Sequence, residues 1–300
     1  MGAAMQLGQL SRWSLFNGAS FCRHHVRRQH SIRGYSSAAD PTSAGGVSLI
    51  QGASRGLGLE FVRQLLETRP DESVVATCRN PSGAEQLQEL ARAHSDRLTV
   101  LPLDVTAEGS IQEAAKSVKA SHGRVDLLVN TAAILHVQGK VQPETALARV
   151  TPEAMLLSYQ VNAMGPILVA KHFHQLLKAG GGKGTRRPAA VLANMSARVG
   201  SIGDNQIGGW HSYRASKTAL NQLSKNLAIE FTRRKDPIIV VMLHPGTVDT
   251  DLSKPFQRGV PEGKLFSKER AVRQLLDIID TRQLEDSGHF FAWDKQEIPW

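Results

Sequence analysis

The sequence predicts an α/β fold: one doubly wound domain with a parallel sheet of about seven strands flanked by helices. Short runs rich in Val, Ile and Leu alternate with segments whose apolar residues recur every three or four positions. The first run, at 47–50, leads into a glycine-rich turn that a helix follows. No domain-scale linker or internal repeat interrupts residues 46–293. This pattern is typical of a Rossmann-like fold in a single domain.

The expected elements alternate along the chain. Strands are expected at about 47–50, 73–77, 98–101, 125–129, 189–196, 238–243 and 288–292. Helices are expected at about 59–66, 83–93, 107–120, 153–178, 211–234 and 267–280. Thr106 is the expected N-cap of the third helix. The stretch 250–266, with its prolines and glycines, is expected to form part of a lid.

The formal net charge of +9 is concentrated near the start of the sequence. Residues 1–39 contain five arginines and no acidic residue, so without them the charge is about +4 (9 − 5). The basic character therefore gives little reason to expect nucleic-acid binding. No apolar run approaches the ~20 residues of a membrane span, so no span is expected either.

Residues 1–39 have the composition of an organellar transit peptide, rich in Arg and Ser and without a long apolar core. The stretch 33–37 resembles a mitochondrial processing site, with cleavage after Tyr35. We expect a mitochondrial protein, ahead of plastid or cytoplasm; an extension without targeting function is the alternative. Beyond this segment Cys78 is the one cysteine, which suits a reducing compartment. No metal site is expected, because the sequence contains no zinc-type ligand cluster.

The glycine-rich turn predicts a phosphate-binding site. Glycines allow a sharp turn and let a pyrophosphate approach the amides at a helix N-terminus. The expected cofactor-binding residues of this turn are Gly52, Ser54, Arg55, Gly56, Leu57 and Gly58.

The end of the second strand predicts which dinucleotide binds. Between Ser73 and Gly83 there is no acidic residue to accept from a ribose 2′-hydroxyl, and Arg79 stands at the strand end. Guanidinium groups of Arg55 and Arg79 suit a 2′-phosphate, so NADP is predicted rather than NAD. Two solvated surface arginines are the alternative.

Tyr213 and Lys217 are four residues apart in the helix expected at 211–234, so they share one face. A neighbouring ammonium group favours the phenolate and is expected to lower the pKa of Tyr213. A phenol tuned in this way can act as a general acid or base. Taken alone, the pair is also compatible with a half-buried aromatic residue beside a solvated lysine.

Taken together, these residues resemble the short-chain dehydrogenase/reductase family over residues 46–293, with 294–300 as a C-terminal tail. The resemblance rests on six pieces in order: 52–58, Asp104-Val105, 130–133, Asn162, 213–217 and Pro245-Gly246. The stretches 195–202 and 208–210 are most similar to the C-factor and sniffer-type carbonyl reductase branch.

The resemblance implies NADP-dependent interconversion of a carbonyl and an alcohol, acting on a small-molecule substrate. Tyr213 would be the acid/base, Lys217 would lower its pKa and bind the nicotinamide ribose, and Asn162 would hold a water of the proton relay. Homodimers or homotetramers through the helices at 153–178 and 211–234 are also implied.

Further cofactor contacts are implied in the same way. Asp104 would contact the adenine, Asn130 would brace the strand beside the cofactor, and Thr247 would contact the nicotinamide carboxamide. Val105, Pro245 and Gly246 are expected to belong to the same binding site.

The sequence departs from the family pattern at Gln51, at Ala133 and, above all, at the serine that polarises the substrate. That serine is usually about thirteen residues before the tyrosine, where this chain has Gly200, and an inserted loop moves the aligned position to about Ala197. We expect Ser196, directly after a strand, to act in its place, ahead of Ser201. The missing serine favours the alternative of a catalytically decayed NADP-binding regulatory or scaffold protein, but the intact Tyr213, Lys217 and Asn162 oppose it, so an enzyme is expected.

The leader prediction can be tested with a reporter. Residues 1–45 fused to a fluorescent protein are expected to direct it to mitochondria, because an Arg-rich segment without acidic residues suits import. Fluorescence microscopy against a mitochondrial dye provides the measurement, and residues 46–90 fused to the same reporter provide the control. A diffuse cytosolic signal from the leader fusion would contradict the prediction.

Overall fold

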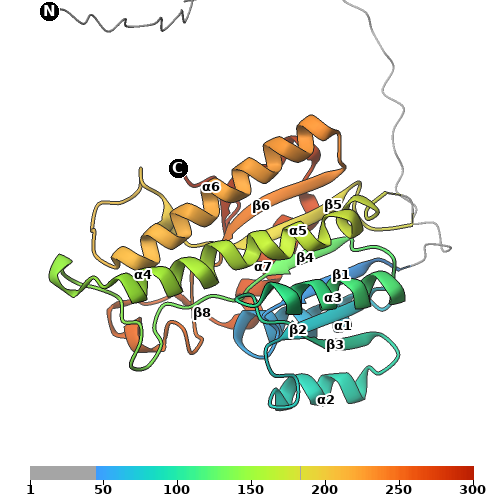
Figure 1. Ribbon diagram of the computed structural model, residues 1–300, viewed down its shortest axis with the longest axis horizontal. Coiled ribbons are helices and arrows are strands. Elements are labelled where there is room, and N and C mark those ends of the chain that lie inside the picture. Colours follow the sequence, from blue (N-terminus) through green and yellow to red (C-terminus); the bar gives the residue numbers. More distant parts are fainter. Residues whose placement is uncertain (1–44, 183) are drawn as a thin grey trace, which may run out of the picture. The chain divides into compact units, whose positions relative to one another are not determined.

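A single seven-stranded parallel sheet forms the centre of the protein (Figure 1). The computed structural model describes residues 45–182 and 184–300. In sheet order β3-β2-β1-β4-β5-β6-β9, the strands are Leu98–Pro102, Ser73–Cys78, Val47–Gln51, Leu127–Asn130, Ala190–Met195, Ile238–His244 and His289–Ala292. Every neighbouring pair is parallel, and the order reverses between β1 and β4. The predicted fold class is confirmed.

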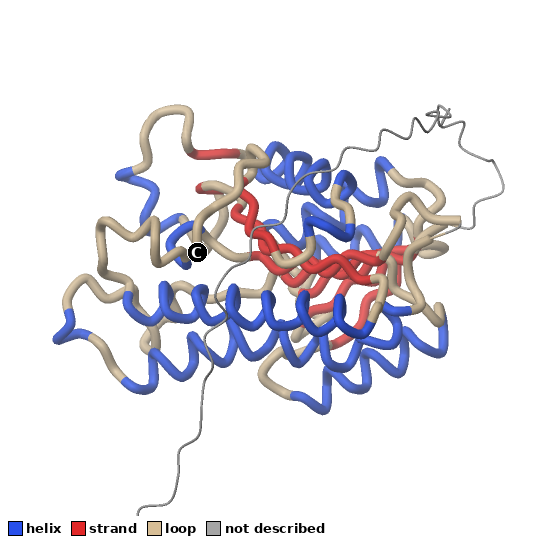
Figure 2. Tube along the Cα trace, turned by 90° about the horizontal axis from the view of Figure 1, so that it is seen from above, coloured by secondary structure: helices blue, strands red, loops and turns tan. Residues whose placement is uncertain are grey.

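Helices cover both faces of this sheet (Figure 2). One face packs on α1 (Gly56–Thr68), α2 (Glu85–Ala93) and α7 (Lys268–Thr281). The other packs on α3 (Glu108–Ser121), α5 (Gly165–Lys178) and α6 (His211–Arg234).

Neighbouring residues of each strand supply these two cores alternately. Ile50 belongs to the core under α1 and Leu49 to the core under α5, and both are fully buried. Successive side chains of a strand point to opposite faces, so a strand covered on both sides must be apolar throughout. The continuous apolar runs of the sequence follow from this arrangement.

The long helix expected at 153–178 is interrupted in its middle. It consists of α4 (Pro152–Tyr159), a π-helical turn η2 (Gln160–Met164) and α5. Asn162 lies within the π turn. Such turns are rare and frequently mark functional sites, because they reorient side chains within an otherwise regular helix.

Thr106 does not cap α3. The helix begins at Glu108 with Ala107 at the N-cap. The hydroxyl of Thr106 donates to Asp104 Oδ1 at 2.7 Å, and the Thr106 amide donates to the same oxygen at 2.9 Å. The aspartate carboxylate thus takes the hydroxyl in a local turn, which is why the capping prediction was wrong.

The segment expected to form a lid has structure of its own. Strand β7 (Thr247–Val248) pairs with β8 (Leu265–Phe266), and the 3-10 helix η4 (Lys254–Gly259) lies between them. The remaining short 3-10 helices are η1 (Leu147–Arg149), η3 (Arg198–Gly200) and η5 (Leu284–Asp286).

Residues 294–300 pack against the domain. Ile298 is buried, its amide donates to Phe290 O at 2.8 Å, and the amide of Gly203 donates to Trp300 O at 2.7 Å. This segment therefore supports the loop that follows β5. The leader expected at residues 1–39 lies outside the described residues. Across the described chain, no helix has the length and apolar character to span a membrane.

Candidate active site

The carboxyl ends of the central strands meet at one edge of the sheet. Gln51 of β1 pairs with Thr77 of β2 and Asn130 of β4, and Asn130 in turn pairs with Asn194 of β5. Because parallel strands bring their carboxyl ends to the same edge, the loops after them face a common region. The site lies at this edge.

The glycine-rich turn is shaped by close backbone contacts. Gly52 has φ +89°, and a Cβ there would lie 2.6 Å from the Ala132 amide nitrogen. A Cβ on Gly58 would lie 2.3 Å from the Gly52 carbonyl oxygen. Only glycine permits these contacts, which press the start of α1 against the end of β1. The Gly56 position, with φ +59°, has only the Thr250 side chain near it. The turn thus fits a pyrophosphate at the N-terminus of α1.

Arg55 and Arg79 follow β1 and β2, which are neighbours in the sheet, and both are exposed. Arg55 Nη1 lies 3.6 Å from Asp251 Oδ2, in a pair whose side chains are 74% and 67% exposed. An exposed ion pair of this kind contributes little, so a phosphate group can replace the carboxylate. Both arginines are therefore available for an anion at the edge of the glycine turn.

The other expected cofactor residues are placed unequally. Asp104 is half-buried and its Oδ1 is bonded to Thr106, while Val105 is buried against Gly165. Pro245 and Gly246 are half-buried and Thr247 is exposed. Val105 therefore supports the site from the core rather than forming its surface.

Asn130 belongs to a buried chain of polar side chains. Its Nδ2 donates to Asn194 Oδ1 at 2.8 Å, and Asn194 Nδ2 donates to Ser224 Oγ at 2.8 Å. All three residues are buried. Buried polar groups require partners, so this chain fixes β4, β5 and α6 relative to one another.

Tyr213 and Lys217 are both buried in the first turns of α6. Lys217 Nζ donates to the Met195 carbonyl oxygen at 2.8 Å and lies 5.8 Å from the centre of the Tyr213 ring. Burial lowers the pKa of Lys217 to about 7. Burial raises the pKa of Tyr213 above its usual value, which is opposite to the direction expected from a neighbouring ammonium. In the cofactor-free protein the phenol is therefore protonated at neutral pH and can serve as a proton donor.

Asn162 links the π turn to this pair. Its side chain accepts from the Ile134 amide at 2.8 Å and donates to the Ile134 carbonyl at 2.8 Å. Its Nδ2 also contacts Ser216 Oγ at 3.0 Å, and that hydroxyl donates to the Tyr213 carbonyl at 2.8 Å. The structure thus brings Asn162 together with Tyr213 and Lys217.

The two candidate serines differ in their hydrogen bonds. Ser196 Oγ donates to Asn221 Oδ1 at 2.6 Å, two helical turns beyond Tyr213 on α6. Ser201 Oγ accepts from the Asp204 amide at 3.1 Å, and its own proton has no acceptor among the described residues. Ser201 also follows Gly200, where a Cβ would lie 2.8 Å from Lys217 Cβ. The two serines therefore differ in whether the hydroxyl proton already has a partner among the described residues.

Three aromatic side chains from separate segments form a row of contacts that begins at Tyr213. The Trp210 ring centre lies 6.3 Å from that of Tyr213 and 5.2 Å from that of Phe256, and His136 lies 6.0 Å from Phe256. All three are half-buried. Sequence patterns did not indicate His136 or Phe256, because His136 lies in a loop and Phe256 in the short 3-10 helix η4, and neither segment shows an apolar periodicity.

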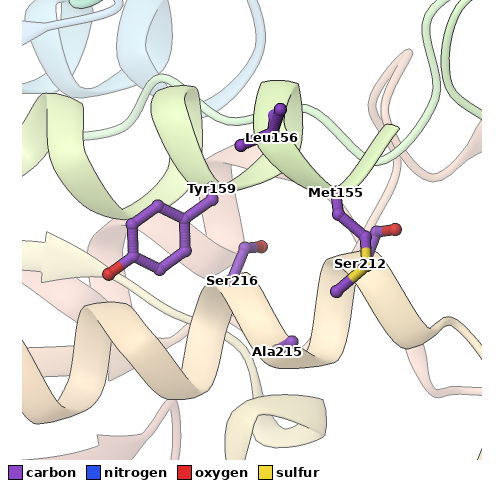
Figure 3. A pocket seen from close by; sticks show the side chains of 6 residues that line it. All are labelled: Met155, Leu156, Tyr159, Ser212, Ala215 and Ser216. Carbon is purple, nitrogen blue, oxygen red and sulfur yellow. The ribbon is translucent and has the colours of Figure 1, made fainter. Parts of the chain in front are cut away.

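An apolar pocket lies elsewhere, between α4 and α6 (Figure 3). It is lined by Met155, Leu156, Tyr159, Ser212, Ala215 and Ser216. Leu156 is 70% exposed, so this pocket belongs to the outer surface of the helices rather than to the strand edge.

The fold and the site together define a doubly wound α/β protein with a glycine-rich turn after its first strand and a buried Tyr–Lys pair, and comparison with known proteins agrees. The family model described as short chain dehydrogenase matches residues 46–260. The chain therefore belongs to the short-chain dehydrogenase family.

Comparison with individual proteins shows which branch of the family the chain resembles. An NADPH-bound carbonyl reductase from chicken fatty liver is 33% identical, with TM-score 0.74 over 85% of this chain and 98% of that one. Carbonyl reductase Sniffer of D. melanogaster is 28% identical, with TM-score 0.73 over 85% of this chain and 99% of that one. C-signal of Myxococcus xanthus is 33% identical over 59% of this chain and 94% of its own length. The chain thus resembles the carbonyl reductase branch, as predicted.

The buried amine of Lys217 predicts a pH-dependent stability. In the folded protein the Lys217 amine has a pKa of about 7, against an ordinary value of 10.5. Below about pH 7 the amine is charged in both the folded and the unfolded protein, so folding must bury a charged ammonium group. Each unit of pKa shift corresponds to ~1.4 kcal/mol of this desolvation cost. Above the ordinary value neither state is charged, so the penalty disappears. The free energy of unfolding of Lys217→Met minus that of the wild type should therefore be largest below about pH 7 and fall by several kcal/mol towards pH 10, on top of the constant cost of losing the hydrogen bond to the Met195 carbonyl.

Urea unfolding of the cofactor-free wild type and Lys217→Met between pH 6 and 10 measures this difference. We expect the advantage of the variant to shrink steadily as the pH rises. Lys119→Met, at an exposed position, is the control. An advantage that stayed constant over this range would contradict a buried, titrating amine.

Proposed function

We propose that this protein is an NADP(H)-dependent oxidoreductase that interconverts a carbonyl and an alcohol by hydride transfer. The observation that carries the proposal is the buried Tyr213–Lys217 pair, at the strand edge that also holds the glycine turn. Family membership and the NADPH-bound carbonyl reductase among its structural relatives support it.

Each residue of the site has a proposed role that follows from where its side chain lies. When bound, the nicotinamide dinucleotide supplies or accepts the hydride. Tyr213, protonated at neutral pH, donates its proton to the oxygen of a carbonyl under reduction, and accepts it back in the reverse direction. Lys217 holds its amine between Met195 and the tyrosine ring, where it can bind ribose hydroxyls. Asn162 anchors the turn from which a water relay could return the proton.

NADP preference rests on the arginines at the two strand ends. Arg79 and Arg55 are exposed on neighbouring segments, and no acidic residue occurs between Ser73 and Gly83. Two guanidinium groups stabilise a 2′-phosphate through charge-assisted hydrogen bonds. NAD lacks the 2′-phosphate, so it would leave both arginine side chains without a ligand.

Ser201 is the better candidate for polarising the carbonyl, although Ser196 was expected because it directly follows a strand. Ser201 is buried, its hydroxyl proton has no acceptor within 45–182 and 184–300, and it directly follows Gly200, whose backbone packs against Lys217. The Ser196 hydroxyl is already donated to Asn221. An oxyanion donor must have its proton available for the substrate.

Two further expectations stay proposals. Exposed Met155, Leu156 and Tyr159 on α4 support self-association through α4 and α6 into a homodimer or homotetramer. The Arg-rich composition of residues 1–39 supports mitochondrial import.

The proposed activity predicts NADPH oxidation with aldehydes, ketones or quinones, followed at 340 nm. Tyr213→Phe should lose at least roughly 100-fold in kcat, because it removes the general acid, while its Kd for NADPH stays within a few-fold. NADH should bind at least about tenfold more weakly than NADPH, because it lacks the phosphate. Glu153→Ala, at an exposed position on α4, is the control. Tight NADPH binding without turnover of any substrate, in wild type and variant alike, would favour a regulatory or scaffold role.

The serine assignment predicts unequal effects of two alanine variants. Ser201→Ala should lower kcat roughly 100-fold, since it removes an oxyanion donor. Ser196→Ala should change kcat by less than about fivefold and mainly lower stability, since it breaks a buried hydrogen bond. Steady-state kinetics with one turned-over substrate decide between them, and the opposite ranking would restore Ser196 to this role.

A further inference from the structure

Glu144 is a buried carboxylate in the loop between β4 and η1. It is 2% exposed, and no ion pair within 4.0 Å joins it to a lysine, arginine or histidine of the described residues. Burying an unpaired charge is unfavourable unless hydrogen bonds compensate for the lost water. Its hydrogen bonds should therefore reveal what it does.

All the hydrogen bonds of Glu144 reach the start of α6, 66 to 68 residues further along the chain. Oε2 accepts from the Ser212 amide at 3.1 Å, and Oε1 accepts from the Ser212 hydroxyl. The Glu144 backbone carbonyl accepts from the Trp210 amide at 2.6 Å. Ser212 immediately precedes Tyr213, so Glu144 holds the turn from which the proposed acid projects.

This contact replaces an ordinary helix cap. Trp210 occupies the N-cap position of α6, and its side chain makes no capping hydrogen bond. The first amides of a helix need an acceptor, and a carboxylate there also interacts favourably with the helix dipole. Glu144, from a separate loop, supplies both the hydrogen-bond acceptor and the carboxylate at this helix end.

Trp210 is held in a conformation that a large side chain rarely adopts. Its φ is 50° and its ψ 44°, in the left-handed region. Such residues persist only where their surroundings fix them, and they cluster at functional sites. Here the Glu144 carbonyl fixes the Trp210 amide, and the Trp210 ring lies 6.3 Å from that of Tyr213.

Tyr213 is therefore anchored from two segments outside its own helix. Asn162 holds Ser216, whose hydroxyl donates to the Tyr213 carbonyl, while Glu144 holds Ser212 on the other side of the tyrosine. Figure 3 shows Ser212 and Ser216 projecting from α6 on the side that faces α4. Asn162 was expected from the sequence; Glu144 was not.

We propose that Glu144 is a positioning residue, which orients the phenol of Tyr213 by capping α6 through Ser212. The expected effect on kcat rests on the proposed function. The expected effect on the position of the Tyr213 ring does not. Small displacements of a reacting group lower the rate of the chemical step far more than they weaken cofactor binding.

Kinetics test the consequence. Glu144→Ala should lower kcat roughly 10- to 100-fold per NADPH-binding site, with the Kd for NADPH within about threefold of wild type. Glu144→Gln keeps an acceptor for the Ser212 amide and should stay within roughly fivefold of wild-type kcat. Glu153→Ala is the matched control at an exposed glutamate. An unchanged kcat per site in Glu144→Ala, or a loss in Glu144→Gln as large as in Glu144→Ala, would overturn the proposal.

Tyrosine NMR tests the positioning without any turnover. The chain has three tyrosines, Tyr35, Tyr159 and Tyr213, so ring-labelled tyrosine gives three signals, and Tyr213→Phe assigns one of them. In Glu144→Ala the Tyr213 signal should shift or broaden, while that of Tyr159 on α4 stays unchanged. A Tyr213 signal identical to wild type would overturn the proposal.

Two further outcomes are distinguishable. If the wild type reduces no carbonyl but the Tyr213 signal still responds, the proposed function fails and the positioning role stands. If Glu144→Ala does not fold, Ser212→Ala removes one of the same hydrogen bonds from its other end. That variant is then expected to shift the Tyr213 signal and lower kcat per site, and a wild-type signal and kcat would overturn the proposal.

Discussion

The hydrogen bond from the Lys217 amine to the Met195 carbonyl joins α6, the helix that bears Tyr213, to the edge of the sheet where the candidate site lies. The amine is buried, so this partner largely decides where it lies. Further polar contacts tie α6 to the same region: the Thr218 hydroxyl donates to the Gly200 carbonyl, and Ser224 accepts from Asn194 Nδ2. These contacts fix the register of α6 on β5, and therefore the distance of Tyr213 from the glycine turn.

The same burial sets the protonation of the pair. Both shifts follow from taking charge out of water: the pKa of Lys217 falls and that of Tyr213 rises. Near neutral pH the uncharged phenol is the favoured form, which is the form that a reductase needs in its proton donor. A simple pairwise argument from a nearby ammonium misses this, because desolvation acts on both groups at once.

Two features near the Tyr213–Lys217 pair are less favourable: the strained backbone of Trp210 and the exposed Arg55–Asp251 ion pair. A left-handed non-glycine residue such as Trp210 costs ~1–3 kcal/mol, which the bonds of Glu144 must offset. On the opposite side, the exposed Arg55–Asp251 pair links the glycine turn to the segment that bears Phe256. At 74% and 67% side-chain exposure this pair contributes little to the position of the segment, and an anion can take the place of the Asp251 carboxylate.

The sequence alone determined the doubly wound sheet, the glycine-rich turn and the Tyr213–Lys217 pair, because each depends on local periodicity or on spacing within one element. Asn162 was found from a family motif, but the π turn around it depends on packing, with Gly165 against Val105. Tertiary structure alone decided the rest. Glu144 lies 68 positions before Ser212, and the hydroxyl of Ser196 is taken by Asn221 across the fold. Such contacts leave no periodic trace in the sequence, because the partners approach only when β4, β5 and α6 pack together.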